Sequence, residues 1–231
     1  MVPKMSKCLM YIFLFIIIYY NMEYVNPTVF VNAKDYDCVI SLGNKCISAI
    51  TLRSLHIYKD SFPFDYIPSN PKLILKYLKD PSDYFPEKNK VMSKDDIWFG
   101  HFDTNEKYEE TIQKFVRRFH RLFDLLDNKK RILFVYTGEG EIFNELGNRY
   151  NDNYTELCNI ENYIKERYKY DNFTILAVHT NKFYSNTKNI INYTIKVPEI
   201  YLSDDMSTHN DETTGPYRHV LKLLMKEIFQ C

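Results

Sequence analysis

The chain has 231 residues, of which 45% are hydrophobic and 16% aromatic, so we expect it to bury a substantial core and to be folded over most of its length. Its thirty basic residues balance its thirty acidic residues. This balance excludes a strong overall field of the kind that attracts nucleic acid or an anionic membrane surface, and we predict no nucleic-acid partner.

Residues 1–33 have the pattern of a hydrophobic leader. Lys4 and Lys7 precede an apolar run from Cys8 to Tyr20, as in the charged and apolar regions of a signal peptide. The run is shorter than the about 20 residues of a membrane span, although an uncleaved anchor stays open as an alternative. The segment therefore predicts a secretory or membrane-anchored protein, associated with membrane only through this segment, or a cytoplasmic protein if translation starts at Met22.

Residues 34–231 are predicted to form one α/β domain, because strand-like and helix-like patterns alternate along them. Such alternation favours a largely parallel sheet flanked by helices. Apolar runs and periodicity predict strands at 38–42, 97–102, 132–136, 173–178 and 195–197, and helices at 46–56, from Pro71 to about 78, 106–127, 142–146, 160–168 and 219–229.

The first strand leads through Gly43 into a helix whose first turn carries Cys46. A helix N-terminus carries about half a positive charge and lowers the pKa of a thiol. Cys46 is therefore the candidate nucleophile, and Asn44 with the nearby backbone amides is the candidate binding site for an oxyanion. The alternative is that Cys46 packs the corner between strand and helix. Cys38, inside the strand, is predicted to be a core residue.

Several motifs in this order resemble an uncharacterised family described as papain-like cysteine peptidases. The matching segments are Gly43-x-x-Cys46 with Leu52-Arg53, Pro63-Phe64-Asp65-Tyr66, Trp98-Phe99-Gly100-His101-Phe102-Asp103, and the arginine-bearing helix followed by Ile132-Leu133-Phe134-Val135. The chain departs from the family pattern at Tyr66, where tryptophan is usual, between His101 and Asp103, which are often adjacent in the family, and at Tyr136, where an arginine is expected. The resemblance implies a thiol hydrolase that acts on a peptide or other small amide or ester.

A cysteine nucleophile needs a base and a group that orients the base. His101, predicted near the end of a strand and supported by the resemblance, is the first candidate, and His179 at the end of another strand is the second. Asp65 and Asp103 are the candidate orienting carboxylates. Asp65 has a structural alternative, because aspartates in turns often bond backbone amides.

Two further functions stay open. The helix bearing Arg117, Arg118 and Arg121 offers an anion site, so the chain is alternatively a glycan- or nucleotide-binding domain, with Arg118 as the substrate-binding residue. It is otherwise a catalytically silent interaction domain that keeps the motifs for packing. The cysteine and histidine spacing matches no metal site, and we predict no cofactor. Disulfide pairing and oligomeric state are not predicted from the sequence.

Overall fold

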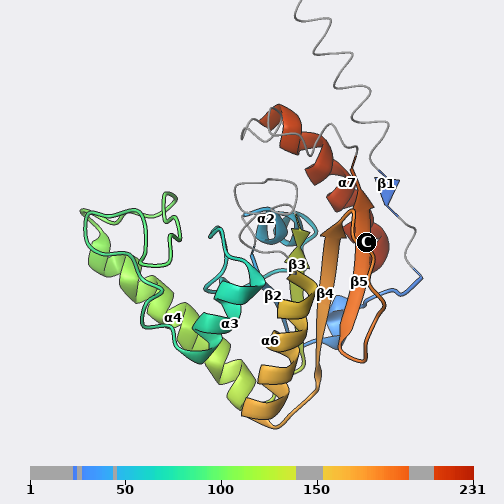
Figure 1. Cartoon of the computed structure of the whole chain (residues 1–231), viewed down its shortest axis with the longest axis horizontal. Helices are drawn as coiled ribbons and strands as arrows, with labels where there is room; N and C mark the ends of the chain where they lie inside the picture. Colours follow the sequence, from blue (N-terminus) through green and yellow to red (C-terminus); the bar gives the residue numbers. More distant parts are fainter. Residues whose placement is uncertain (1–22, 25–27, 44–45, 139–152, 198–210) are drawn as a thin grey trace, which may run out of the picture.

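The computed structural model describes residues 23–24, 28–43, 46–138, 153–197 and 211–231, with side chains of the last segment described from Tyr217 onward. Helices connect most of the strands, with three helices in succession between β2 and β3 (Figure 1). The elements are β1 (Glu23–Tyr24), the short 3-10 helix η1 (Ala33–Asp35), β2 (Cys38–Ser41), α2 (Ile47–Ser54), α3 (Pro71–Lys79), α4 (Tyr108–Asp127), β3 (Ile132–Thr137), α6 (Asn153–Tyr168), β4 (Phe173–Thr180), β5 (Ile190–Lys196) and α7 (Asp211–Phe229).

One five-stranded sheet in the order β1-β5-β4-β3-β2 forms the centre of the protein. The pairs β2–β3, β3–β4 and β4–β5 are parallel, and only the two-residue β1 is antiparallel to its neighbour. All side chains of β3 are buried, as expected for a central strand covered by helices on both faces. The structure confirms the predicted α/β class and the largely parallel sheet.

The helices divide between the two faces of the sheet. The hydroxyl of Ser41 in β2 contacts that of Ser48 in α2, so this face of β2 is covered by α2, which also packs on α7. His179 in β4 contacts the rings of Tyr136 in β3 and Tyr154 in α6. The strand register sets Tyr136 opposite Ala177 and Ser41 opposite Val135. Because side chains alternate along a strand, α6 covers the face opposite to α2, together with α3 and α4, which contact α6 (Figure 1).

Helix α4 explains why its sequence is so strongly periodic. Phe115, Phe119, Leu122 and Leu126 recur every three or four residues and are all buried. Tyr84 lies at the centre of the aromatic cluster that they help to form, with its ring 4.9 Å from that of Phe119 and 5.5 Å from that of Phe115. Its hydroxyl donates to the carbonyl of Pro63, so the fully buried tyrosine is satisfied and holds the Pro63–Tyr66 turn.

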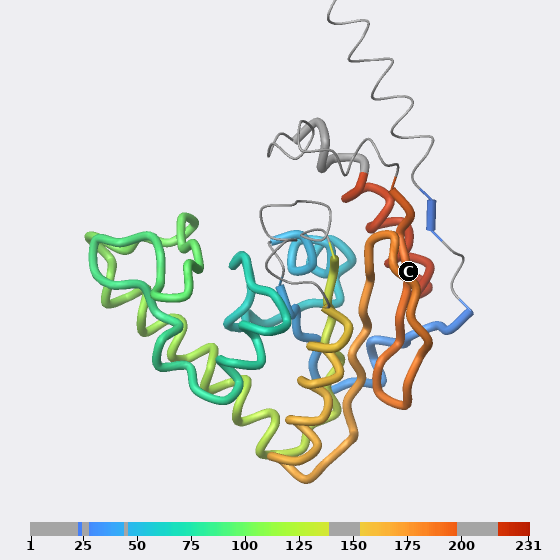
Figure 2. Tube along the Cα trace, in the orientation of Figure 1, coloured from blue at the N-terminus to red at the C-terminus, as the bar shows by residue number. Residues whose placement is uncertain are grey.

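The predicted strand over 97–102 is wrong. Within this segment the structure shows turns and a single isolated bridge between Met92 and Trp98. Ile97 and Phe99 are buried, which gave the alternation of a strand, but Phe99 packs its ring against Tyr84 and Phe115, and the segment is not paired with a strand of the sheet. The segment belongs to the long connection between α3 and α4, which extends beside the start of α4 (Figure 2).

The remaining predicted elements are confirmed with changed ends where they are described. Strand β5 begins at Ile190, five residues before the predicted start, while α6 begins at Asn153 and α7 at Asp211. The predicted helix over 142–146, Asn44 and most of the leader lie outside the described residues. In the part of the chain that is described, no helix has the length and apolar character needed to cross a membrane.

Candidate functional site

Cys46 occupies the N-cap position of α2, directly beyond the carboxyl end of β2. Its side chain is half-buried and makes no capping hydrogen bond to the helix. The backbone amides of a first helical turn have no partner within the helix. The predicted thiol position is therefore confirmed, at the edge of a parallel sheet where α/β proteins usually bind ligands.

Gly43 brings this turn against the Pro63–Tyr66 turn. It has a φ of +79°, which favours glycine, and a Cβ there would lie 2.3 Å from the Ser69 hydroxyl and 3.0 Å from the Phe64 carbonyl oxygen. The two motifs that contain Gly43 and Phe64 are therefore in direct backbone contact, although about twenty residues of chain separate them.

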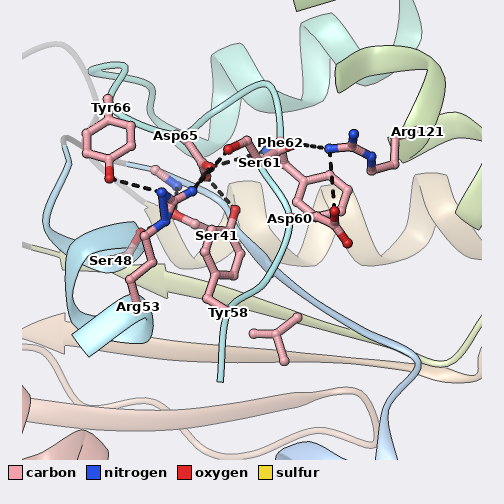
Figure 3. Close-up of polar contacts among 12 residues, drawn as sticks. Ser41, Ser48, Arg53, Tyr58, Asp60, Ser61, Phe62, Asp65, Tyr66 and Arg121 are labelled. Atoms are coloured by element: carbon pink, nitrogen blue, oxygen red, sulfur yellow. Dashed lines mark hydrogen bonds and ion pairs between the residues drawn. The ribbon is translucent and has the colours of Figure 1, made fainter. Parts of the chain in front are cut away.

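The carboxylate of Asp65 lies at the centre of a buried hydrogen-bond network (Figure 3). It accepts from the Tyr58 hydroxyl at 2.5 Å, from Arg53 Nη2 at 3.1 Å and from the Phe62 amide at 3.2 Å. The Asp65 side chain is 0% exposed, whereas that of Arg53 is 34% exposed. The bond to Phe62 confirms that Asp65 satisfies a backbone amide in its own turn, as the structural alternative predicts.

Two effects act on the ionisation of Asp65. Burial raises its pKa above the usual range, while hydrogen bonds from Tyr58 and Phe62 and the charges of Arg118 and Arg53 act in the opposite direction. Burial also raises the pKa of Tyr58, and the neighbouring Asp65 carboxylate adds to that shift. Tyr58 therefore keeps its proton, and its hydroxyl donates a hydrogen bond to Asp65.

Tyr66 connects this network to His101. The Tyr66 hydroxyl accepts from Arg53 Nη1 at 3.2 Å, and its ring centroid lies 6.4 Å from that of His101 in an edge-on arrangement. The His101 ring also lies edge-on to Trp98, at 5.3 Å. Tyr66 has a φ of +61°, which is uncommon for a bulky residue and which places strain in this turn.

The structure does not join His101 to either candidate orienting carboxylate. His101 is exposed and lies in a turn, not at the strand end that the sequence predicted. Asp103 is also exposed, and it accepts a hydrogen bond from the Asn105 amide at 2.9 Å. Hydrogen bonds from the amides of Asn105 and Lys107 lower the pKa of Asp103, so this carboxylate caps the chain just before α4.

His179, the second candidate base, is fully buried inside β4. Its Nε2 lies 3.1 Å from Asn192 Oδ1, and its ring contacts those of Tyr136, Tyr154 and Tyr184. The ring therefore faces α6, while Cys46 begins the helix on the other face of the sheet. His179 and Cys46 therefore start from opposite faces of the sheet.

The three arginines of α4 have different surroundings. Arg117 is exposed, and Arg121 Nη1 donates to the Ser61 carbonyl at 2.7 Å (Figure 3). Arg118 is half-buried, with its guanidinium 5.0 Å from the ring of Phe115 and 5.7 Å from that of Phe102. Its Nη1 is buried without a hydrogen-bond partner, and burial lowers the pKa of the group while the charge of Asp65 opposes this effect.

The motif segments therefore converge, although they are far apart in the sequence. The contacts and charges described above connect five of their residues: Arg53, Asp65, Tyr66, His101 and Arg118. Tyr58 is the residue that sequence reasoning missed, because a tyrosine between two motifs gives no signal that its hydroxyl will bond a buried carboxylate. Among the described residues, no group of three or more histidine, cysteine or acidic side chains is arranged to hold a metal ion.

Comparisons with known proteins found no relative of this chain. A scan of family models, a search of curated proteins and a search of solved structures each gave no match. The resemblance to papain-like cysteine peptidases, and the activity that it implies, therefore stay predictions from the residues.

Proposed function

We propose that this protein is a thiol-dependent hydrolase that acts on a peptide or other small amide or ester, with Cys46 as the nucleophile. The observation that carries the proposal is the half-buried position of Cys46 at the N-terminus of α2, beyond the carboxyl end of β2. The helix dipole there favours a thiolate. The first-turn amides offer donors to the oxyanion that forms when the thiolate attacks a carbonyl.

His101 is the proposed base and Asp65 the proposed positioning residue. The contacts of His101 support this assignment. Its ring contacts that of Tyr66, the Tyr66 hydroxyl accepts a hydrogen bond from Arg53, and Arg53 also bonds Asp65. Asp65 thus acts through Tyr66 and not by a direct bond to the imidazole. His179, the alternative candidate for the base, faces α6 on the other side of the sheet.

The first test measures the rate of iodoacetamide labelling at each cysteine of the full chain by mass spectrometry, as a function of pH. Cys46 is expected to label faster than the exposed Cys231 and to keep its rate below about pH 8.5, where an ordinary thiol becomes protonated. His101→Gln is expected to slow labelling of Cys46, and the matched His120→Gln, an exposed histidine on α4, is expected to leave it unchanged. A Cys46 rate no higher than that of Cys231 contradicts the proposal.

A second candidate function is recognition of an anionic ligand, such as a phosphorylated glycan or a nucleotide, at Arg118. The supporting observation is its buried Nη1 without a hydrogen-bond partner. The nearby Asp65 carboxylate already bonds Arg53, so the two arginines share one negative charge. Because a half-buried cation without a full counter-charge favours an anion, a phosphate or carboxylate group suits this position.

Arg117 and Arg118 provide a matched pair for testing this candidate. Inorganic pyrophosphate is expected to raise the melting temperature of the native chain by an amount that grows with its concentration relative to Kd. Arg118→Gln is expected to abolish this shift, whereas Arg117→Gln, at the exposed neighbour, is expected to preserve most of it. An equal loss in both variants, or no shift in the native chain, rejects the anion site.

A further inference from the structure

A buried hydroxyl lies at the carboxyl end of the sheet without a hydrogen-bond partner. Thr137 is the last residue of β3 and is 0% exposed. Its Oγ1 is buried and bonds none of the residues that the structure describes. The large majority of buried polar groups in folded proteins are hydrogen-bonded, so this exception needs a physical reason, and a role in catalysis is one.

The strand register places the Thr137 side chain on the face of the sheet that α2 covers. Ser41 pairs with Val135, and the Ser41 hydroxyl contacts that of Ser48 in the first turn of α2. Because side chains alternate along a strand, Thr137 projects from the same face as Val135. The Leu42 amide donates to the Val135 carbonyl at 2.8 Å, so β2 and β3 stay side by side up to the end of β2.

Thr137 and the start of α2 lie at the same end of this face. Thr137 is two residues beyond Val135, which is about 7 Å further toward the carboxyl end of the sheet. Cys46 precedes Ser48 at the N-terminus of α2, also beyond the carboxyl end of β2. Helix α2 packs on β3 as well as on β2. The unpartnered hydroxyl is therefore directed to the side of the sheet where α2 begins.

Three neighbouring hydroxyls on this face already have partners. The Ser41 hydroxyl accepts from the Gly43 amide at 3.2 Å and contacts the Ser48 hydroxyl. In β4, Thr180 lies two residues beyond the partner of Thr137 in the register, and its Oγ1 donates to the Gly138 carbonyl at 3.0 Å. Of these four described hydroxyls, that of Thr137 alone keeps its proton for another acceptor.

We propose that Thr137 is a further catalytic residue of the Cys46 site, and that its hydroxyl donates a hydrogen bond to the oxyanion formed when Cys46 attacks a carbonyl. This inference rests on the proposed hydrolase function and adds a side-chain donor to the first-turn amides of α2. The Cys46 sulfur bonds to the carbonyl carbon, and the carbonyl π electron pair moves to the oxygen. That pair re-forms the double bond when the alcohol or amine leaves.

A threonine hydroxyl suits this task for two reasons. Its proton rotates about a single bond, so it turns to a new acceptor without movement of the backbone. In a site shielded from water, a donor that is already in place stabilises developing charge more strongly than it would in water.

The test compares two reactions of Cys46 in the full chain, each followed by mass spectrometry as an initial rate. In acetylation by p-nitrophenyl acetate, the sulfur attacks a carbonyl, an oxyanion forms and p-nitrophenolate leaves. In alkylation by iodoacetamide, the sulfur displaces iodide and no oxyanion forms. The ratio of the acetylation rate to the alkylation rate at Cys46, divided by the same ratio at the exposed Cys231, therefore reports stabilisation of the oxyanion.

Two variants of Thr137 separate the hydroxyl from the shape of the side chain. Thr137→Val removes the hydroxyl and is expected to lower the ratio about tenfold or more, because loss of one oxyanion donor slows acyl transfer by about 100-fold or more in a known hydrolase. Thr137→Ser keeps the hydroxyl and is expected to preserve most of the ratio. The urea midpoint of Thr137→Val should not fall below that of the native chain, because no hydrogen bond with the described residues is lost.

The outcomes distinguish this inference from the function on which it rests. Rapid alkylation of Cys46 with the same ratio in Thr137→Val and the native chain overturns the role of Thr137 and leaves the nucleophile in place. An equal fall of the ratio in Thr137→Ser and Thr137→Val also overturns it, because packing would then explain the effect. Alkylation of native Cys46 no faster than that of Cys231 overturns the proposed function and this inference together.

Discussion

Asp65 offers the sharpest test of what holds the motif segments together. Replacing it by alanine removes the acceptor of the Tyr58 hydroxyl and of the Phe62 amide, both of which are buried. Each buried donor that is left without a partner costs about 1–3 kcal/mol. Arg53 also loses its carboxylate partner, but its side chain is 34% exposed, so water compensates much of that loss.

The sum predicts that Asp65→Ala lowers the free energy of unfolding by about 3–5 kcal/mol, in line with the loss of one partner of a buried ion pair. For a chain of this size that corresponds to a fall in melting temperature of roughly 10 °C. Asp65→Asn keeps one acceptor oxygen and is expected to cost about 2–3 kcal/mol.

Urea unfolding followed by circular dichroism measures these differences. Asp60→Asn is the matched control, because Asp60 is exposed and its closest cation is 4.0 Å away, and a change within about 0.5 kcal/mol is expected there. A double-mutant cycle with Tyr58→Phe should show coupling between Tyr58 and Asp65 of about 0.5–3 kcal/mol. An Asp65→Ala variant as stable as the Asp60 control would refute the reasoning.

Three further outcomes follow from individual residues. Gly43→Ala should lower the free energy of unfolding by about 2 kcal/mol or more, because it combines a positive φ with a clash against Ser69 and Phe64. The comparison variant is Gly100→Ala, where the added Cβ meets the side chain of Trp98, which is 44% exposed and can move. Equal urea midpoints for the two variants would contradict this. Burial, reinforced by Asp60, raises the pKa of the Cys38 thiol to about 12, so mass spectrometry should find Cys38 labelled more slowly than Cys231 at neutral pH. The pKa of Asp103 is lower in the folded chain than in the unfolded chain, so its contribution to stability is present above the unfolded pKa and is lost as pH falls through the folded pKa. Asp103→Asn should therefore lose less stability than the native chain on acidification. Parallel profiles of stability against pH for the two proteins would argue against the capping role of Asp103.

The sequence predicted the elements whose patterns arise from local geometry. The spacing of Phe115, Phe119 and Leu122 marks one face of a helix, and the structure confirms it. The 97–102 segment shows where this reasoning fails. Burial of Ile97 and Phe99 produces the same alternation whether the backbone pairs with a strand or only packs aromatic side chains around Tyr84. Pairing depends on a partner strand, and no local pattern reports one.

Strand β5 is longer than its sequence pattern predicts, for a related reason. Polar residues such as Asn192 interrupt its apolar pattern, so only the last residues of the strand were predicted. In the structure Asn189 Nδ2 donates to the carbonyls of Asp171 and Phe173, which fixes the start of β5 beside β4. This anchoring depends on a contact between segments, and propensity along one segment does not contain it.

The candidate site was also predictable only in part. The position of Cys46 follows from local order, because strand, glycine turn and helix are consecutive in the chain. The partners of Asp65 do not follow in this way, because Arg53 reaches it from α2 and Tyr58 from the chain after α2, and only the tertiary fold brings these segments to the Pro63–Tyr66 turn.

The two faces of the sheet bear directly on the choice of base. In β4 the side chains of Ala177 and His179 share one face, and the register with Tyr136 makes that the face covered by α6. Helix α2 begins on the other face, so Cys46 and His179 start from opposite faces of the sheet. His101 has no such barrier, since it contacts Tyr66 in the turn whose Phe64 packs against Gly43. Under the proposed hydrolase function we therefore expect the base to come from the α3–α4 connection, and replacement of His101, but not of His179, should change the pH dependence of Cys46 labelling.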